Sequence, residues 1–480
     1  MPAIKSILKG LFMSAALSSG FSAAADEPNK KSADLIVGGD YMVTQDPRNP
    51  VIKNGGVAVK DGQIIAVGTL ADILAAYQAR DILDGTDRIL MPGLVNGHSH
   101  AAMTLFRGIA DDLDLMTWLT QYIFPMEGRF VDAGFVKTGT ELACLEMIKS
   151  GTTTFADMYF YADTVAETVE KCGIRAIVGS AMIDFPSPGY QGWDDSFKSG
   201  VDFVRRWQNK PGASGRVTPA LAPHAPYTVS QEHLVEAASA AKTLGAPITI
   251  HLSEDYSEIT TIKERYGTTP VRHLGRTGLL ENQVIAAHVV WPTDDELPLM
   301  ARANFGAIHN PTSNMKTAAG LSPVPKMLEA GINVGLGTDG AASNNNLDMW
   351  QEIHLAALLH KGFNRQPTLM PAETVIRMAT LGGAKAIGLG DVTGSLEVGK
   401  RADIIQISVN DPALTPLYSV VSHLAYAVNA NHVVTTIVDG NVLMREGRVQ
   451  TLDQDQIIAD ARAKAAQIKA AMASQAAKAK

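Results

Sequence analysis

Two histidines separated by a single residue, His98 and His100, are the side chains in this sequence best suited by type and spacing to bind a metal ion. In an extended segment, residues at i and i+2 project on the same face, so both imidazoles can reach one ion. One such pair is weak evidence by itself. Further titratable residues recur far along the chain: His224, His251, Glu254, His288, His309 and Asp339. Brought together by the fold, these residues would supply metal ligands and groups that move protons.

The elements that must position these residues are short β-branched runs, which alternate with helical patterns. The eight runs lie at residues 89–95, 152–156, 174–182, 217–222, 247–250, 284–287, 305–308 and 332–336. Segments between them, such as 230–244 and 294–303, carry apolar residues at helical spacing and begin with capping residues. Eight strand–helix units predict an α/β fold, a (β/α)8 TIM barrel. Because the titratable residues follow the strands, and the carboxyl ends of barrel strands form the active-site face, we expect one shared pocket.

Both flanks of this barrel have the pattern of short strands joined by turns. Asp61-Gly62, between two alternating runs, is typical of a hairpin, and residues 397–451 carry a similar pattern. We therefore expect residues 26–90 and 397–451 to build one small β-sandwich domain from both chain ends, beside a barrel of residues 91–396. Residues 452–480 are rich in Ala and Lys and contain no Gly or Pro, which predicts a C-terminal surface helix.

The first 25 residues differ from the rest of the chain. Lys5 and Lys9 precede a weakly apolar stretch, residues 10–21, and Ala23-Ala24-Ala25 precedes Asp26. This order predicts a cleaved secretory signal peptide and a periplasmic or secreted mature protein. The serines within the stretch lower its hydrophobicity, so the alternative interpretation is an N-terminal tail on a cytosolic protein. The apolar run is too short for a permanent transmembrane helix, so we expect no permanent membrane association.

The net charge of the chain limits the classes of molecule that it is expected to bind. The 41 Lys and Arg residues against 49 Asp and Glu give a net charge of −8 without a basic block, so we expect a small-molecule substrate and no nucleic acid. The sequence leaves open whether the protein forms a homo-oligomer.

The chain has only two cysteines, Cys144 and Cys172. The favoured interpretation is two separate buried thiols, and the alternative is a single disulfide.

Five phrases in a fixed order carry a family resemblance. They are residues 92–100 (PGLVNGHSH), 250–254 (IHLSE), 287–288 (AH), 311–314 (PTSN) and 337–340 (GTDG). With them, nearly the whole mature chain resembles the amidohydrolase superfamily. Within it, the chain is similar to the branch of methylthioadenosine/S-adenosylhomocysteine deaminases and s-triazine chlorohydrolases.

The resemblance implies a metal centre and its ligands. His98, His100, His251 and Asp339 would bind one divalent metal, with Zn expected and Fe(II) open, since nitrogen and oxygen ligands suit both. Residues 217–224 contain no Lys that could bridge a second ion, so we expect one metal. Such an ion lowers the pKa of bound water to about 7 and makes hydroxide available at neutral pH.

The resemblance also implies roles around that centre. Glu254 would carry a proton to a ring nitrogen, while His288 and Asp339 help to deprotonate or orient the water. His224 would touch the substrate, and Glu127, which closes residues 118–127, would accept hydrogen bonds from a ribose diol. A loop carboxylate facing water is the plainer alternative for Glu127. His309 and Asn314 would shape the rim of the site: we expect no catalytic role for them.

Hydrolytic deamination of an adenine nucleoside, such as S-adenosylhomocysteine or methylthioadenosine, is therefore the leading functional hypothesis. The alternative keeps the metal and changes the substrate: s-triazine dechlorination or deamination, guanine-type deamination, or hydrolysis of an exported natural product. A remote alternative is a non-catalytic periplasmic metal-binding protein. Such a carrier has no need of Glu254, His288 and Glu127 beside its ligands.

Overall fold

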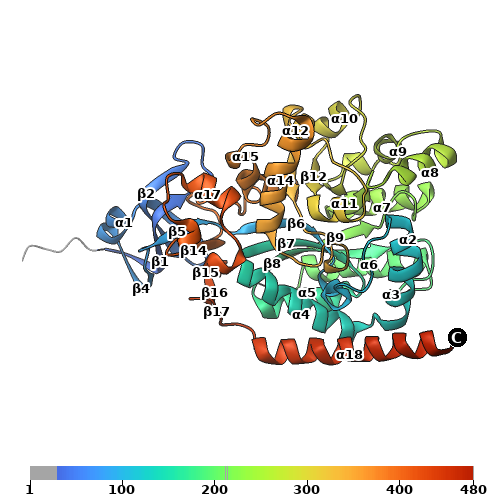
Figure 1. The fold of residues 1–480 in the computed structure, drawn as a ribbon, viewed down its shortest axis with the longest axis horizontal. Helices are drawn as coiled ribbons and strands as arrows, with labels where there is room; N and C mark the ends of the chain where they lie inside the picture. The colour runs from blue at the N-terminus through green and yellow to red at the C-terminus, as the bar shows by residue number, and fades with distance from the viewer. Residues whose placement is uncertain (1–29, 211, 213, 479–480) are drawn as a thin grey trace, which may run out of the picture.

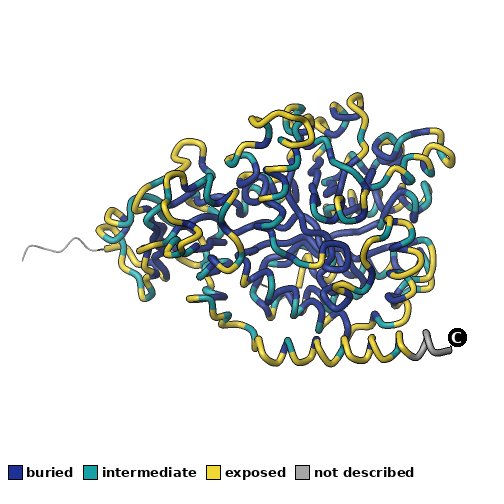
Figure 2. The backbone as a smooth tube through the Cα atoms, in the orientation of Figure 1, coloured by how far each residue is buried: buried dark blue, intermediate teal, exposed yellow. Residues whose placement is uncertain are grey.

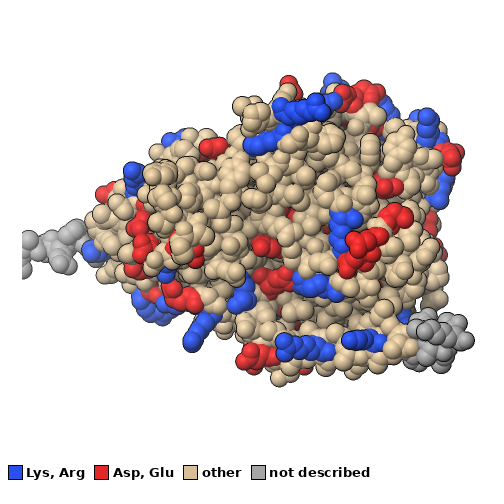
Figure 3. Space-filling model, viewed as in Figure 1, with Lys and Arg blue, Asp and Glu red and all other residues tan. Residues whose placement is uncertain are grey.

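The structure is a computed structural model that describes residues 30–210, 212 and 214–478. The predicted signal peptide, residues 1–25, lies outside the described residues. Figure 1 shows a large strand-and-helix body with a smaller sheet domain at one end. Within the described part of the chain, no helix combines the length and hydropathy needed to cross a bilayer. On the face in Figure 3, basic and acidic side chains intermingle and form no continuous basic patch.

The large body is a barrel of eight parallel strands. These are β6 (Leu94–Ser99), β7 (Thr152–Tyr159), β8 (Arg175–Met182), β9 (Val217–Pro223), β10 (Ile248–Leu252), β11 (Val284–His288), β12 (Phe305–His309) and β13 (Asn333–Leu336). Each pairs with the next in chain order. Just after β13, Asp339 N donates to His98 O of β6 at 3.0 Å, which links the last strand to the first. The predicted TIM barrel is confirmed.

Burial explains why these strands are apolar throughout. Parallel strands covered on both faces need no alternation of apolar and polar residues, and Figure 2 shows them buried at the centre of the body. One apolar cluster draws on six of the strands, as the interior of a closed barrel requires: Val95, Ala156, Ile177, Ala220, Ile285 and Ile308. A larger cluster joins the outer faces of the strands to the surrounding helices.

Helices surround the barrel. They include α4 (Ala133–Ser150), α5 (Ala162–Cys172), α6 (Trp193–Gln208), α7 (Gln231–Leu244), α8 (Tyr256–Tyr266), α10 (Leu297–Arg302) and α14 (Met349–Asn364). Four of them, α4, α7, α8 and α14, begin at a residue whose side chain caps the first turn. Before α7, Ser230 Oγ accepts from His233 N, and Gly245 ends the helix at φ +63°. The helix expected at 230–244 is thus present. The one expected at 294–303 is shortened to α10.

The strand expected at residues 89–95 is divided between two sheets. β5 (Arg88–Pro92) pairs with β14 (Ile404–Ser408) of the smaller domain, whereas β6 belongs to the barrel. At the junction, a Cβ on Gly93 would overlap the Thr153 side chain, so the chain passes close to β7 here. The sequence prediction of a single strand was wrong because the apolar run continues through this crossing.

The smaller domain is one hydrogen-bonded sheet built from both ends of the described chain. Its remaining strands are β1 (Lys31–Val43), β2 (Val51–Lys60), β3 (Gln63–Thr69), β4 (Tyr77–Leu83), β15 (Val433–Val438), β16 (Asn441–Arg445) and β17 (Arg448–Val449). Asp61 and Gly62 have φ of +51° and +74° and join β2 to β3 as the predicted two-residue turn. The small β domain predicted from both chain ends is confirmed.

The C-terminal segment and the cysteines lie on the barrel. α18 (Gln454–Lys478) runs along the outside of the barrel against α4, at the lower edge of Figure 1. Cys144 of α4 and Cys172 of α5 are buried and form no disulfide. Cys172 beside it, together with burial, raises the pKa of the Cys144 thiol well above its ordinary value. The favoured interpretation of buried free thiols agrees with this arrangement.

Candidate active site

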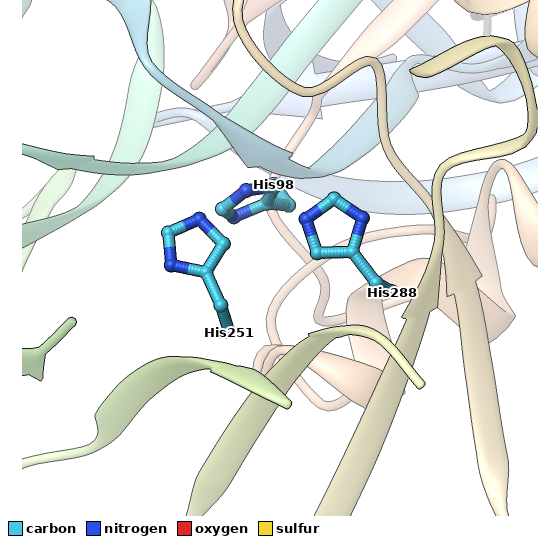
Figure 4. Close-up of side chains that lie close together, drawn as sticks. All are labelled: His98, His251 and His288. Atoms are coloured by element: carbon cyan, nitrogen blue, oxygen red, sulfur yellow. The ribbon is translucent and has the colours of Figure 1, made fainter. Parts of the chain in front are cut away.

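Histidines from three strands converge at the carboxyl end of the barrel. His98 of β6, His251 of β10 and His288 of β11 direct their rings toward one another in Figure 4. One ring nitrogen from each lies within 4.8 Å of the others, and all three side chains are buried. One ligand atom from each of His98, His100 and Asp339 also lies within 4.8 Å of the others. The fold therefore gathers residues that are up to 241 positions apart (339 − 98 = 241).

Hydrogen bonds fix the ring orientation of two of the histidines. His100 Nδ1 donates to Met158 O at 2.6 Å, and His251 Nδ1 donates to His224 O at 2.9 Å. With Nδ1 bound to a carbonyl oxygen, each ring directs its Nε2 into the centre, and the two Nε2 atoms face each other at 3.2 Å. Two ring nitrogens this close need either a proton or a metal ion between them. This arrangement fits a bound metal and the backbone support that metal-binding histidines commonly have.

Asp339 completes the donor set. Its Oδ1 lies 3.4 Å from His98 Nε2 and 3.2 Å from His100 Nε2. Its Oδ2 accepts from Ser313 Oγ at 2.6 Å and from Ser343 Oγ at 2.7 Å. Burial disfavours the ionised form, but the facing histidines outweigh it and hold the pKa of Asp339 well below its ordinary value. Imidazole nitrogens and an ionised carboxylate together suit a divalent metal.

Glu254 lies beside this centre in a constrained turn. Its Oε1 is 3.6 Å from His288 Nε2. The preceding Ser253 has φ +50°, and Glu258 accepts hydrogen bonds from the backbone nitrogens of Ser253 and Glu254, each at 3.0 Å. Burial, reinforced by the nearby Asp339 charge, raises the pKa of Glu254 well above its ordinary value. The raised pKa favours the protonated form of this side chain.

His288 is held in its neutral form. Its Nδ1 donates to Asn314 Oδ1 at 2.9 Å, and its backbone nitrogen donates to Asn310 Oδ1 at 3.3 Å. Burial lowers the pKa of the ring. The buried Nε2 has no hydrogen-bond partner among the described residues, and it carries the lone pair. A neutral imidazole that accepts at Nε2 thus faces the carboxyl group of Glu254.

Glu127 reaches the site on a continuous helical segment. The segment comprises α2 (Leu115–Thr117), a π-helical part, η2 (Trp118–Ile123), and α3 (Phe124–Phe130). Glu127 is 4% exposed, and its Oε1 accepts from Tyr159 OH at 2.8 Å. Burial raises the pKa of Glu127 to about 7. The alternative of a loop carboxylate facing water is therefore wrong.

One cavity brings the sequence-predicted residues together. Those that line it are His100, Glu127, His224, His251, Glu254, His288 and Asp339. His98 is buried behind them, with its ring centroid 4.8 Å from that of His100 and 5.0 Å from that of His251. Leu115, Leu119 and Ile123 contribute apolar walls, and no Lys or Arg of the described chain lines the cavity. Such walls exclude water and strengthen the electrostatic interactions inside.

Several residues of this site were missed or underrated from sequence. Trp118 lines the cavity, and its buried Nε1 has no partner among the described residues. Tyr159 holds Glu127, and Asn314 contacts His288 rather than only shaping the rim. His309 packs against His360 of α14, with ring centroids 5.3 Å apart. Trp118 and Glu127 are nine residues apart, about two and a half turns of an α-helix, so helical spacing in the sequence could not have placed Trp118 beside Glu127.

Comparisons with known proteins agree with this geometry. The family model described as "Amidohydrolase family" matches residues 89–443. A 5-methylthioadenosine/S-adenosylhomocysteine deaminase of Syntrophobacter fumaroxidans is 44% identical over 426 residues, 89% of this chain and 96% of the relative. A 5'-deoxyadenosine deaminase of Methanosarcina acetivorans is 46% identical over 441 residues, 91% of this chain and 98% of the relative.

A solved structure extends the likeness to the fold. The crystal structure of an adenosine deaminase from Xanthomonas campestris with bound zinc has a TM-score of 0.89 and 37% sequence identity. It covers 92% of this chain and 100% of its own. The family match spans most of the sequence, and the relatives cover both the barrel and the sheet domain. This chain belongs to the amidohydrolase family.

Proposed function

We propose that this protein is a divalent-metal-dependent hydrolase that deaminates an adenine nucleoside. The carrying observation is that one cavity contains Glu254, 3.6 Å from His288, and a second carboxyl group, Glu127, beside the histidine cluster. The two relatives named above as deaminases of modified adenosines support the same class of substrate. Deamination replaces the C6 amino group of adenine with oxygen from water and releases ammonia.

The metal would be held by His98, His100, His251 and Asp339, whose donor atoms lie together in the buried cluster. When bound, a divalent ion acts as a Lewis acid and lowers the pKa of water from 15.7 to about 7. Zinc is the proposed ion, since neutral imidazoles and a carboxylate suit it and a related structure carries zinc. Metal analysis of the purified protein tests this: about one zinc per chain is expected, and one iron per chain would contradict it.

The protein's own residues would handle the protons. Burial raises the pKa of Glu254, which favours its protonated form, and Glu254 is placed to donate this proton to ring nitrogen N1, which makes C6 more electrophilic. His288 accepts a proton at Nε2, 3.6 Å from Glu254 Oε1. Asp339, ionised and fixed by Ser313 and Ser343, orients the attacking water. A proton delivered to the amino group allows ammonia to leave.

Substrate orientation would depend on Glu127 and His224. Glu127 lies on the cavity wall with one oxygen bound to Tyr159, so its other oxygen can accept from a ribose hydroxyl. The ring of His224 is fixed through Nδ1 by Thr228 Oγ1 at 2.9 Å. Burial and the neighbouring histidines lower the pKa of His224 to about 3. A neutral His224 therefore offers its remaining ring nitrogen to the substrate.

The test is ammonia release from methylthioadenosine, S-adenosylhomocysteine, 5'-deoxyadenosine, adenosine, guanine and a chlorotriazine, followed with ultraviolet spectra. We expect ammonia from adenine nucleosides. In Glu254→Gln, kcat should fall by about 10² to 10⁴ with unchanged metal content. Glu264→Gln on the exposed side of α8 is the matched control and should retain activity. Chloride from the triazine, or ammonia only from guanine, would contradict the proposal.

Export is a second part of the proposal. The basic residues, apolar stretch and Ala23-Ala24-Ala25 of the first 25 positions support a cleaved signal peptide and a periplasmic or secreted enzyme. Expression in the source organism, followed by fractionation and N-terminal sequencing, tests this. A mature chain beginning at Asp26 outside the cytoplasm is expected. An unprocessed chain in the cytoplasm would contradict it.

A further inference from the structure

Two cavities meet at Glu127. The inner one contains the histidine cluster, and an outer chamber of about 290 Å³ lies beside it. Both are lined by Phe124, Glu127, Phe160 and Ile183. With the adenine at the histidine cluster and the ribose at Glu127, the sugar lies at the boundary between the two spaces. Its 5' end is then the part of the nucleoside that reaches the outer chamber.

The outer chamber has apolar and aromatic walls. The loop between β8 and α6 supplies Phe185, Pro186 and Tyr190, and the Phe185 and Phe124 rings pack edge to face with centroids 5.6 Å apart. Glu127 is the one charged side chain among the described residues that line it. Ser187 Oγ is buried there without a hydrogen-bond partner in the described chain. The chamber thus offers neutral polar groups, on Ser187, Tyr190 and Gln191, and no cation among the described residues that line it.

We propose that the outer chamber binds the 5' substituent of the nucleoside and selects uncharged groups, such as a 5'-deoxy or 5'-methylthio end, against an amino-acid tail. This inference rests on the proposed function. A volume of about 290 Å³ is not small enough to exclude such a tail by size, so the chemistry of the walls decides. The carboxylate of such a tail would lose water and meet no Lys or Arg, while Glu127, which could pair with the tail's ammonium group, is bound to Tyr159 and proposed to hold the ribose.

A nucleoside with a 5'-hydroxyl should bind with intermediate affinity. It can bond to Ser187 Oγ, whereas an apolar 5' group packs against Phe124 and Phe185 without desolvating a polar atom. The expected order of affinity is therefore methylthioadenosine and 5'-deoxyadenosine first, adenosine next and S-adenosylhomocysteine last. We expect the last to bind about tenfold more weakly than methylthioadenosine, because the walls offer its carboxylate no Lys or Arg.

The first experiment measures binding and turnover separately. Calorimetry with zinc-loaded Glu254→Gln gives Kd for the four nucleosides, and ammonia release by the wild-type enzyme gives kcat/KM. Equal Kd values for S-adenosylhomocysteine and methylthioadenosine, or no binding of any nucleoside, would overturn the chamber assignment. Absence of ammonia from every nucleoside would overturn the proposed function, while the order of Kd still decides this inference.

The second experiment adds a positive charge to the chamber. Phe185 is 38% exposed on its loop, and Phe185→Arg can stack on Phe124 while offering a guanidinium to a carboxylate. Phe185→Gln is the matched uncharged control. We expect Phe185→Arg to bind S-adenosylhomocysteine about tenfold more tightly than Phe185→Gln, with equal Kd for methylthioadenosine. The same S-adenosylhomocysteine affinity in both folded variants, checked by thermal melting, would overturn the inference.

Discussion

Glu258 shows how a residue behind the cavity wall can control a group on it. Its carboxylate accepts both backbone N–H groups of the Ser253–Glu254 turn, where Ser253 has φ +50°. In Glu258→Gln, an amide NH₂ replaces one acceptor and faces a backbone donor, so the turn must shift. We expect kcat to fall by about 10- to 100-fold, because displacement of a proton donor by about 1 Å has effects of this size.

The measurement for Glu258→Gln is steady-state kinetics together with metal content. KM and the metal content should change little, because Glu258 contacts neither the cavity nor the histidine cluster directly. A variant with wild-type kcat would show that the turn holds Glu254 in place without this carboxylate.

The raised pKa of Glu127 leads to a specific expectation for the pH dependence of kcat/KM. Burial raises its pKa to about 7, so the side chain becomes protonated as the pH falls below 7 and loses its charge as an acceptor. If it binds the ribose diol, kcat/KM should fall toward tenfold per pH unit below pH 7. Glu127→Gln should remove this acidic limb and lower kcat/KM at pH 8 by about 10- to 100-fold, the value of hydrogen bonds to a charged group. An acidic limb that persists in the variant would contradict this role.

At the residue scale, sequence could identify side chains whose types already match the chemistry. His98, His100 and Asp339 follow strands, and barrel geometry brings strand ends together. Trp118, Tyr159 and Glu258 could not be identified in this way. Their roles depend on contacts that only the folded loops create, such as the 2.8 Å bond from Tyr159 to Glu127.

The turn between β2 and β3 offers a test of the smaller sheet. Gly62 has φ +74°, and a Cβ there would overlap Arg401 Nη2 and Asp439 O. Gly447 has φ +73° with no atom within 4 Å of a Cβ. Alanine at Gly447 should therefore cost only the left-handed backbone penalty, about 1 kcal/mol, while alanine at Gly62 adds steric overlap and should cost about 2–4 kcal/mol.

Thermal melting and urea unfolding of the two alanine variants compare these costs. Gly62→Ala should melt at the lower temperature. Equal melting temperatures would show that Arg401 and its loop move away freely. Ammonia release by both folded variants should match the wild type, because the turn lies outside the residues that line the active-site cavity.

At the element scale, periodic patterns and turn residues predicted most of the fold. The Asp61-Gly62 turn and the helix begun by Ser230 formed as expected. The division of residues 89–95 between two sheets was missed because an apolar run does not record which sheet each half joins. The π-helical part at Trp118–Ile123 also has no signal of its own, since α and π helices bury similar apolar faces.

At the scale of the whole molecule, buried titratable groups set the pH dependence of stability. Burial raises the pKa of Glu352 to about 7 and that of Glu258 to about 8, from 4.5. The folded state therefore binds more protons than the unfolded state above pH 4.5, and the free energy of unfolding falls as the pH rises through 7 and 8. Burial lowers the pKa of His360 to about 4, so its effect has the opposite sign and is complete above pH 6.5.

The directions of these pKa shifts predict a lower Tm at pH 8.5 than at pH 6.5. Both samples contain the same chelator, so that metal binding does not contribute to the difference in stability. Scanning calorimetry measures this difference. Glu352→Gln should reduce the slope between the two pH values, because its side chain no longer ionises in either state. A Tm that rises over this interval would contradict the assignment of these carboxyl groups.

The sheet built from both chain ends has a consequence for how the protein is made. Pro92 of β5 pairs with Ile404 of β14, 312 residues later (404 − 92 = 312). At about 5–20 residues per second, a ribosome needs roughly 15–60 s to synthesise that interval. During this time the first strands lack the partners that complete their sheet. A nascent chain that stays incompletely folded for so long remains a substrate for chaperones.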